Sequence, residues 1–321
     1  RRGGAMAGSG RQAAIRALVA LVAVASAPQG LAFQSSVRAV QLRPFVPAPR
    51  APVLGGWSKP PAPLVIRPAA PLVPVLGPVP TAVGLNSALA GLGVATRQSM
   101  LTPSGLLHAW ALGVILWSSL GWQGWSLCVL YLLAGSKVTK IRMKEKQDLG
   151  ISEGRGGRRG PENVWGSAAT GALCAIAALR WPEARPLLQV AYVSSIATKL
   201  ADTFQSEVGK AFGKRCFLIT TLKPVPRGTE GAISVEGTLA GVVGSLLIAA
   251  YGAGVNLMPW SCVWVVAAAA FFATMAESLI GATAQGRFKL LTNEVVNFIN
   301  TLIGAAVAAG LVSMTRLRFL A

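Results

Sequence analysis

Hydrophobic segments follow one another from residue 82 almost to the end of the chain. They cover residues 82–97, 104–120, 123–136, 163–180, 187–202, 233–252, 259–280 and 294–313. An α-helix needs about 20 predominantly apolar residues to cross a bilayer, and several segments approach that length. Only 13% of the residues are charged, whereas soluble domains carry about 25%. The sequence therefore predicts an all-α fold: a polytopic membrane helix bundle of about seven or eight transmembrane helices, formed by one domain over residues 81–321.

The first 80 residues differ in composition and are expected to form a targeting segment. We expect translation to start at Met6, followed by a basic region with Arg11 and Arg16 and by the apolar run ALVALVAVASA. This run of about 11 residues is too short to cross a bilayer and is typical of a signal peptide. The proline-rich tract behind it is expected to be disordered, because proline removes a backbone donor.

The composition of this front segment also suggests a destination. Phe33 follows the signal-like run, and no acidic residue precedes Glu145. This arrangement resembles the two-part plastid address of algae with complex plastids, so we expect a multi-pass protein of a plastid membrane. An ordinary secretory leader with a disordered linker is the alternative.

Basic residues gather in three connections between the hydrophobic segments. The formal net charge is +19, from 30 basic and 11 acidic residues, and the connections at 137–162, 203–232 and 281–293 hold many of the basic ones. With eight spans, all three connections fall on one face of the membrane. By the positive-inside rule this face is cytosol-like, which in a plastid is the stroma. The charge therefore indicates topology, and no nucleic-acid partner is expected. The four cysteines lie far apart, so neither a disulfide framework nor a zinc site is indicated.

The first connection contains GRGGRRGPENVWGS over residues 154–167. Glycines allow a close backbone approach, arginines pair with phosphate oxygens, and the helix that we predict to start at Pro161 favours anions at its N-terminus. Arg158, Arg159 and Asn163 are therefore candidate substrate-binding residues. A basic loop that only fixes the topology is the alternative.

The second connection begins with KLADTFQSEVGKAFGKR over residues 199–215. If the helix continues past the hydrophobic segment, Asp202, Ser206 and Gly209 share one face. A carboxylate there could hold Mg²⁺, which usually takes one or two carboxylates together with substrate phosphates. Glu207 lies off that face and is the second candidate metal ligand. The positive charge near the site would come from Lys199, Lys210 and Lys214. A charged cap that ends the span is the alternative.

The stretch ITTLKPVPRGTEGAISVEG, from residue 219, supplies two further cations. Lys223 and Arg227, beside a metal carboxylate, would form a cradle for a polyphosphate. We predict that Ser234 caps the next helix. Glu236 lies in the first turn of that helix, where a negative charge suits the helix dipole, so a purely structural role is the alternative to nucleotide binding for this residue. The candidate nucleotide-binding residues here are Gly228, Thr229, Glu230 and Glu236.

The last two hydrophobic segments carry polar residues at helical spacing. Glu277, Gly281 and Gln285 recur one turn apart. Beyond a short connection, an amide stripe runs along one helix face at Asn293, Asn297 and Asn300. These amides could position a phosphate or a sugar. The alternative, strongest for Asn300, is that they only join helices to one another, as amides in a bilayer can do. The candidate binding residues are Glu277, Gln285, Asn293 and Asn297.

The four motifs, in this order, resemble the integral-membrane family of transmembrane protein 19 and, within it, the chloroplast phytyl-phosphate kinases of tocopherol synthesis. The resemblance covers roughly residues 85–311. It is carried by GRRGPENVWGSAATG, KLADTFQSEVGKAFGK, ITTLKPVPRGTEGAISVEGTLAG and AESLIGATAQ with TNEVVNFIN. LKPVPRGTEG is also similar to the nucleotide loop of polyprenol and phytol kinases that use CTP. Gln205 and the short connection after Gln285 depart from the family pattern.

The resemblance implies a membrane-embedded kinase. It would transfer a phosphoryl group from CTP or another nucleoside triphosphate to phytyl phosphate, or a related prenyl phosphate, in phytol salvage for tocopherol synthesis. We expect Mg²⁺ at Asp202, alone or shared with Glu207, while Lys223 and Arg227 would neutralise the transferred group as catalytic residues. The remaining expectations are that Arg158 and Arg159 hold the prenyl phosphate and that its C20 tail lies along a groove at Gly237 and Gly241.

Three other classes of function fit parts of the sequence. A membrane transporter would explain the intramembrane Glu277 and the glycine-broken helices. A CTP-dependent lipid cytidylyltransferase would release pyrophosphate, whereas a CTP-dependent kinase would release CDP. A scaffold without catalysis would tolerate the loss of Asp202 and Lys223. The oligomeric state does not follow from the sequence.

Overall fold

The structure, a computed structural model, describes residues 78–96, 100–285 and 288–315. The predicted signal and plastid-targeting features lie outside these residues. The helices are α3 (Pro78–Ala95), α4 (Pro103–Thr139), α5 (Met143–Asp148), α6 (Pro161–Arg180), α7 (Arg185–Phe212), α8 (Val235–Gly254), α9 (Val263–Thr283) and α10 (Asn293–Thr315). Short 3₁₀ turns cover Gly154–Gly157, Pro182–Ala184 and Trp260–Cys262.

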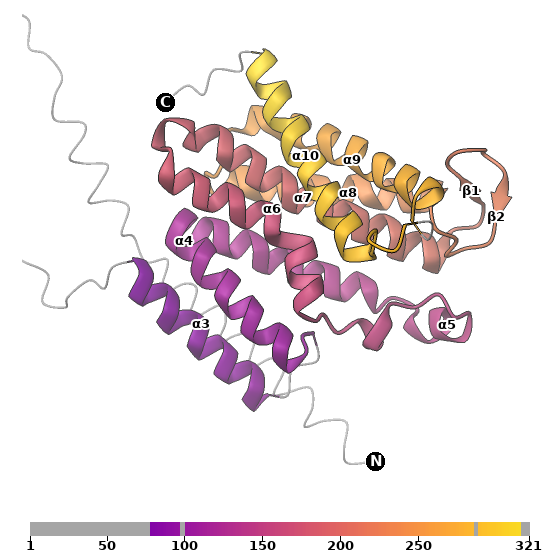
Figure 1. Cartoon of the computed structure of the whole chain (residues 1–321), viewed down its shortest axis with the longest axis horizontal. Helices are drawn as coiled ribbons and strands as arrows, with labels where there is room; N and C mark the ends of the chain where they lie inside the picture. Colours follow the sequence, from indigo (N-terminus) through magenta and orange to yellow (C-terminus); the bar gives the residue numbers. More distant parts are fainter. Residues whose placement is uncertain (1–77, 97–99, 286–287, 316–321) are drawn as a thin grey trace, which may run out of the picture.

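The predicted helical membrane bundle is confirmed. Each of the eight hydrophobic segments coincides with a helix or with half of one, because α4 contains two of them and reverses direction at Gly121, whose φ is 71° (Figure 1). Among the described residues, five helices are long and apolar enough to cross a membrane: α3, α4, α8, α9 with the turn before it, and α10. The helix predicted to start at Pro161 does so.

The first helix begins inside the proline-rich tract. Pro78 and Pro80 lie in the first turn of α3, although the prolines up to residue 80 were expected to exclude a helix. The first turn tolerates proline because its N–H groups have no helical partners in any case.

Helix α7 lies at the centre of the bundle. Every residue from Val190 to Ala201 is buried, and α7 packs against α4, α6, α8, α9 and α10. The helix continues to Phe212, beyond the predicted segment that ended at residue 202. This continuation carries the polar second motif out of the apolar core in helical form.

The glycines of α8 pack directly against α7, which corrects the expected tail groove. A Cβ atom added at Gly237 would lie 2.6 Å from the carbonyl oxygen of Gln205, and one at Gly241 would lie 3.1 Å from that of Ala201. Small residues let two helix backbones approach closely in a membrane. The space that the sequence suggested for a lipid tail is therefore filled by the neighbouring helix.

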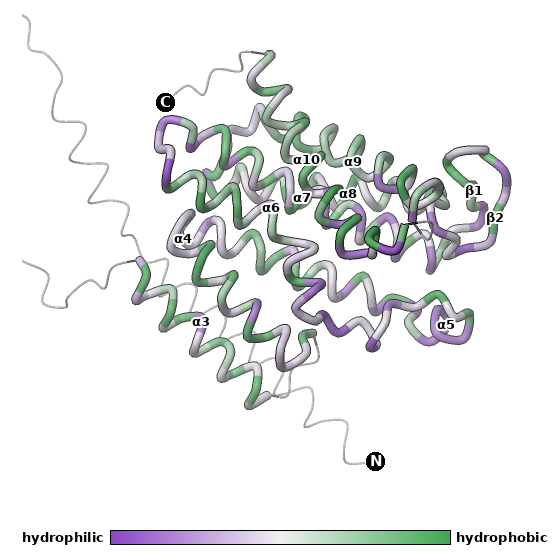
Figure 2. Tube along the Cα trace, in the orientation of Figure 1, coloured by the Kyte–Doolittle hydropathy of each residue, from purple (hydrophilic) through white to green (hydrophobic). Residues whose placement is uncertain are grey.

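The second connection is more ordered than the polar loop that was expected. It folds into a small antiparallel sheet, in the order β2-β1-β3, from Cys216–Leu218 (β1), Pro224–Val225 (β2) and Ala232–Ser234 (β3). Figure 2 shows hydrophilic residues gathered at the end of the bundle that carries this sheet and α5, while the helices are mostly hydrophobic along their length. Ser234 accepts a hydrogen bond from the backbone N–H of Gly237 at 3.1 Å and caps α8 as predicted.

Candidate active site

A polar cavity of about 200 Å³ opens at this hydrophilic end of the bundle. Its wall combines residues of α4, α6, α7, α9 and α10 with residues of the loops at 153–159 and 228–234. All three basic connections, or the helix ends that they join, therefore contribute to one cavity. Of the predicted site residues, the following line it: Arg158, Arg159, Asn163, Lys199, Asp202, Glu207, Gly228, Thr229, Glu230, Glu277, Gln285, Asn293 and Asn297.

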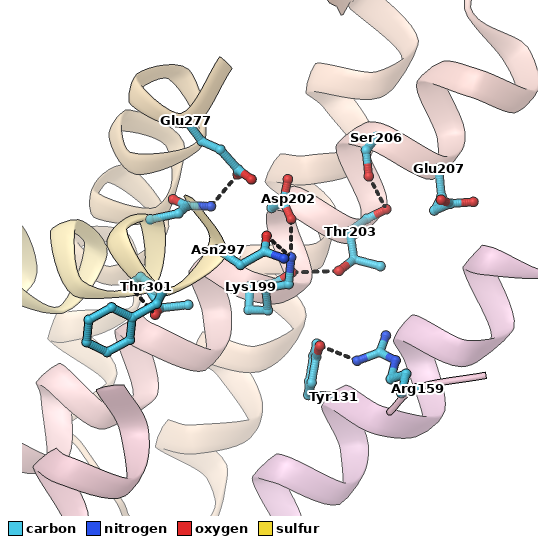
Figure 3. Close-up of polar contacts among 12 residues, drawn as sticks. Tyr131, Arg159, Lys199, Asp202, Thr203, Ser206, Glu207, Glu277, Asn297 and Thr301 are labelled. Atoms are coloured by element: carbon cyan, nitrogen blue, oxygen red, sulfur yellow. Dashed lines mark hydrogen bonds and ion pairs between the residues drawn. The ribbon is translucent and has the colours of Figure 1, made fainter. Parts of the chain in front are cut away.

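Asp202 lines the cavity as part of a network of charges and amides. Its carboxylate accepts a hydrogen bond from Lys199, one turn earlier in α7 (Figure 3). The Lys199 ammonium also donates to Oδ1 of Asn297, on α10, at 2.6 Å. Both charged side chains are largely buried, with 9% and 17% exposure. The helix face that was predicted at Asp202, Ser206 and Gly209 does line the cavity.

Glu277 brings a second carboxyl group from α9 to Asp202. Both carboxyl groups line the cavity, and Figure 3 shows them turned toward the same space. Asn300 donates a hydrogen bond to Glu277, and its own Oδ1 is buried with no partner among the described residues. The amide stripe of α10 therefore holds the two charged helices together at Asn297 and Asn300, while Asn293 is exposed at the cavity mouth.

Glu207 has a different environment from the one expected for a shared metal ligand. Its carboxylate forms an ion pair with Lys146 of α5, and both side chains are almost fully buried. Lys146 also donates to the carbonyl oxygen of Thr139 at 2.7 Å, and Lys210 lies 3.7 Å from Glu207. Asp202 and Glu277, not Asp202 and Glu207, are therefore the carboxyl pair that the structure brings together.

Arg159 is positioned by the start and the second half of α4. Its backbone N–H donates to Met100 at 2.9 Å, and its carbonyl accepts from Thr102 at 3.0 Å. Its guanidinium lies over the ring of Tyr131, 4.8 Å from the centroid, and donates to the Tyr131 hydroxyl (Figure 3). A Cβ atom at Gly135 would lie 2.7 Å from this guanidinium, so a glycine leaves room for it.

Arg158 and Arg159 differ from the other cations on the cavity wall in their partners. Arg158 is exposed and donates to the carbonyl oxygen of Leu101 at 3.3 Å. In the described part of the chain neither arginine forms an ion pair with a carboxylate, whereas Lys199 and Lys210 do. Two guanidinium groups with no acidic partner in a polar cavity are suited to bind an anion such as a phosphate.

Two glycines place the loop at 228–231 against its neighbours. Gly228 and Gly231 have φ values of 83° and 73°, a region that residues other than glycine rarely adopt. A Cβ atom added at Gly228 would lie 2.6 Å from Ile151. One added at Gly231 would lie 2.6 Å from the carbonyl oxygen of Ser278. The loop is therefore held between the first connection and α9, with Thr229 and Glu230 on the cavity wall.

The two cations of this motif do not line the cavity. Lys223 is exposed between β1 and β2, where its carbonyl accepts from Leu218 at 3.0 Å. Arg227 donates to the carbonyl oxygens of Lys210 and Ala211 at 3.3 to 3.4 Å and pairs with Glu145 at 3.4 Å. It thus caps the C-terminus of α7, a position that favours cations. The expected polyphosphate cradle of Lys223 and Arg227 is not formed in this arrangement.

Three other predicted residues have structural contacts. Glu236 accepts a hydrogen bond from the backbone N–H of Lys214 at 3.4 Å, and neither residue lines the cavity. Asn163 lines it, but its side-chain oxygen accepts from Gly160 at 3.0 Å and from Arg155 at 2.7 Å. Because Asn163 caps α6 in this way, its contribution to the site is partly structural.

Several wall residues were not selected from the sequence as site residues. They include Tyr131, Thr139, Glu153, Ser167 and Cys216. Lys210, which the sequence indicated as positive charge near the site, also lines the cavity. Tyr131 sits in an apolar segment and gave no such indication. Burial, with a smaller effect of Glu236, raises the pKa of the Cys216 thiol above its usual value of 9.0, so this thiol remains protonated and a poor nucleophile at neutral pH.

The carboxyl pair fits Mg²⁺ better than a metal that takes all its ligands from protein. Among the described residues, no group of three or more His, Cys, Asp or Glu side chains could hold a metal ion. Two carboxylates, from Asp202 and Glu277, match a Mg²⁺ that completes its shell with water and substrate phosphates. The same set does not match a structural zinc site, which needs four protein ligands.

Comparison with known proteins places this geometry in a family. Residues 86–305 match the integral membrane protein family DUF92. The chain belongs to this family. It is 55% identical to the uncharacterized membrane protein sll0875 of Synechocystis over 238 residues, which are 74% of this chain and 92% of the relative. The matched range contains every predicted site residue, and no solved structure matches the chain significantly.

Two further relatives come from a plant and an archaeon. The chain is 41% identical to protein VTE6, chloroplastic, of Arabidopsis thaliana over 235 residues, which are 71% of this chain and 70% of the relative. It is 31% identical to the uncharacterized membrane protein MJ0933 of Methanocaldococcus jannaschii over 217 residues, which are 66% of this chain and 85% of the relative.

Proposed function

We propose that the protein is a membrane phosphotransferase that converts phytyl phosphate, or a related prenyl phosphate, to the diphosphate with CTP or another nucleoside triphosphate. The observation that carries the proposal is the polar cavity, whose wall holds two carboxyl groups and two arginines that have no acidic partner among the described residues. The resemblance of the four motifs to phytyl-phosphate kinases and the 41% identity to a chloroplastic plant protein support the reaction class.

In the proposed reaction, an oxygen of the prenyl phosphate attacks the terminal phosphorus of the nucleotide. The new P–O bond joins the two phosphates of the prenyl diphosphate. The bond between the transferred phosphoryl group and the nucleoside diphosphate breaks, and the nucleoside diphosphate leaves with the electron pair of that bond. The attacking phosphate monoester is already anionic near neutral pH, and no side chain needs to remove a proton. Positioning and charge neutralisation are what such a transfer chiefly requires.

The wall residues supply these two requirements. Arg158 and Arg159 bind the prenyl phosphate, since both present donors to an anion. Asp202 and Glu277 would hold Mg²⁺, which when bound neutralises charge on the triphosphate. The nucleotide phosphates would lie against Lys210 and against the backbone of the loop at Gly228 and Thr229. Lys223 and Arg227 do not line the cavity and take no part in this arrangement.

We also propose a plastid membrane as the location, with the cavity on the stromal side. The support is the acid-free front segment and the chloroplastic relative. Nucleoside triphosphates are present in the stroma, and the cavity opens at the end of the bundle where the basic connections meet.

The deciding assay uses the full chain purified in detergent. Labelled phytyl phosphate is incubated with Mg²⁺ and, in turn, CTP, ATP, UTP or GTP, and both products are identified. We expect phytyl diphosphate and a nucleoside diphosphate in equal amounts. Pyrophosphate with a nucleotide-linked lipid would indicate a cytidylyltransferase. Movement of the substrate across vesicles without nucleotide consumption would indicate a transporter, and either result would overturn the kinase proposal.

A further inference from the structure

A second cavity lies beside the polar one and is almost entirely apolar. It has a volume of about 170 Å³ and is bounded by α3, both halves of α4 and α6. Its walls include Leu89, Leu106, Leu116, Val129 and Leu132. We refer to this space as the α3–α4–α6 groove.

The groove and the polar cavity share part of their walls. Tyr131, Arg159, Asn163 and Ser167 line both. The Arg159 guanidinium, stacked over Tyr131, therefore stands where the apolar space meets the polar one. A ligand with a charged head and a hydrocarbon chain could therefore place its head at the Arg159 guanidinium and its chain in the groove.

Polar side chains of Asn86, Trp110 and Trp125 on the groove wall have partners within the protein. Asn86 donates to the carbonyl oxygen of Ala82 at 2.8 Å, and its Oδ1 accepts from Nε1 of Trp125 at 3.1 Å. Trp110 donates to the Ser87 hydroxyl at 3.0 Å. These groups need no ligand partner, so the groove offers a hydrocarbon chain an apolar lining.

We propose that the α3–α4–α6 groove holds the isoprenoid chain of the prenyl phosphate whose phosphate group binds Arg159. This inference rests on the proposed function and replaces the α7–α8 interface, which close packing fills. The shared Arg159 decides the occupant, because it lines both the apolar groove and the polar cavity in which the prenyl phosphate is proposed to bind.

Photocrosslinking tests the location without relying on turnover. The full chain in detergent micelles is irradiated with geranylgeranyl phosphate that carries a diazirine at the end of its chain, and labelled peptides are mapped. We expect label on α3, α4 and α6, displaced by phytyl phosphate and not by phosphatidic acid. Four results would overturn the inference: label on α7 and α8, uniform label on lipid-facing helices, no label, or equal displacement by phosphatidic acid.

A matched pair of variants tests the role of the groove in catalysis. Ala109 lines the groove, whereas Ala111, on the same helix and also half-buried, does not. We expect Ala109→Phe to lower kcat/KM for geranylgeranyl phosphate relative to the C5 dimethylallyl phosphate by about 10-fold or more, while Ala111→Phe leaves this ratio unchanged. If Ala109→Phe does not fold, Ala90→Phe on α3, with the exposed Ala88→Phe as control, repeats the comparison.

The outcomes separate the inference from the proposed function. Wild-type protein that is labelled in the groove but forms no diphosphate would overturn the kinase proposal and retain the binding site. If the wild-type protein forms the diphosphate but is labelled outside the groove, the inference alone is overturned. The same holds if Ala109→Phe and Ala90→Phe leave the ratio of kcat/KM for the two chain lengths unchanged.

Discussion

At the scale of single residues, the charges that the sequence places among hydrophobic segments find partners on other helices. Lys199 binds Asp202 and Asn297, and Glu207 pairs with Lys146. The Glu207 partner lies 61 positions away in the chain, which is why sequence spacing made Glu207 look like an available metal ligand. Two cations, Lys146 and Lys210, already neutralise Glu207. Asp202, by contrast, is paired with Lys199 alone among the described residues and shares the cavity wall with a second carboxyl group, Glu277.

The carboxyl pair and the loop lysine give opposite predictions. We expect Asp202→Asn and Glu277→Gln each to lower turnover by about 100-fold and to raise the Mg²⁺ concentration for half-maximal activity, because each removes a ligand charge. Lys223→Ala should leave the Mg²⁺ dependence unchanged, since Lys223 is exposed in the β1–β2 turn. Titration of activity with Mg²⁺ and EDTA measures both. A Lys223→Ala variant as impaired as Asp202→Asn would restore the catalytic role that the sequence suggested.

The Lys146–Glu207 pair makes a prediction about stability. Removal of one partner leaves a buried charge, which costs about 3–5 kcal/mol, whereas replacement of both by apolar groups can be neutral. We expect Lys146→Met to lower the thermal unfolding midpoint in detergent, with a smaller loss in Lys146→Met combined with Glu207→Leu. Lys210, 3.7 Å from Glu207, will reduce the effect of the single variant. Additive losses in the double variant would contradict a coupled pair.

At the scale of elements, the glycines of α8 show how composition alone can mislead. The sequence indicated a helix face with small residues, and that face exists at Gly237, Gly241 and Gly244. Small residues, however, leave a groove only where no neighbour enters it. Here the backbone of α7 does, because a Cβ atom on this face would lie within 2.6 to 3.1 Å of the carbonyl oxygens of Gln205 and Ala201.

Matched glycine substitutions test this packing. Gly237→Ala should destabilise the protein by about 1–3 kcal/mol, because its Cβ would overlap the Gln205 carbonyl oxygen and force α7 and α8 apart. A Cβ atom at Gly310, on α10, meets no atom within 4 Å, so Gly310→Ala should be neutral or stabilising by up to about 1 kcal/mol. Thermal unfolding in one detergent compares the two. Equal midpoints would show that α8 has room beside α7.

At the scale of the whole molecule, three connections far apart in the chain form one polar end of an apolar bundle. Figure 1 shows why: the reversal in α4 and the antiparallel return of later helices bring α5, the small sheet and the start of α10 to the same end. The arginines of the first connection, the carboxylate of α7 and the glycine loop of the second connection meet there. A site for two phosphorylated substrates needs this convergence, since no single connection holds both cations and carboxylates in position.

Sidedness follows from the same convergence and can be measured directly. In a variant without the four native cysteines, single cysteines at the exposed positions Lys144, Lys223 and Lys289 should react with a membrane-impermeant maleimide from one side of sealed vesicles. A cysteine at Glu183, in the turn between α6 and α7, should react only from the other side. Reaction of the first three from different sides would contradict a single cavity.

The sequence by itself determined the class of fold and the motifs. Runs of apolar residues fix helices in a bilayer, because backbone groups there have no other way to be satisfied, and the helix bounds agree with those runs to within a few residues, except where α7 continues to Phe212. The sequence also selected Asp202, Glu277 and the arginine pair as candidates, because charge beside hydrophobic segments is costly, and all four residues line one cavity.

Only the tertiary structure decided which charges face one another. It paired Glu207 with Lys146, turned Arg227 to the end of α7, closed the Gly237 face and opened the α3–α4–α6 groove instead. These outcomes depend on helix order and on packing between segments distant in the chain. A one-dimensional pattern contains the periodicity of each helix but not the identity of the surface that each helix meets, and it is that surface which decides whether a charge is paired or free.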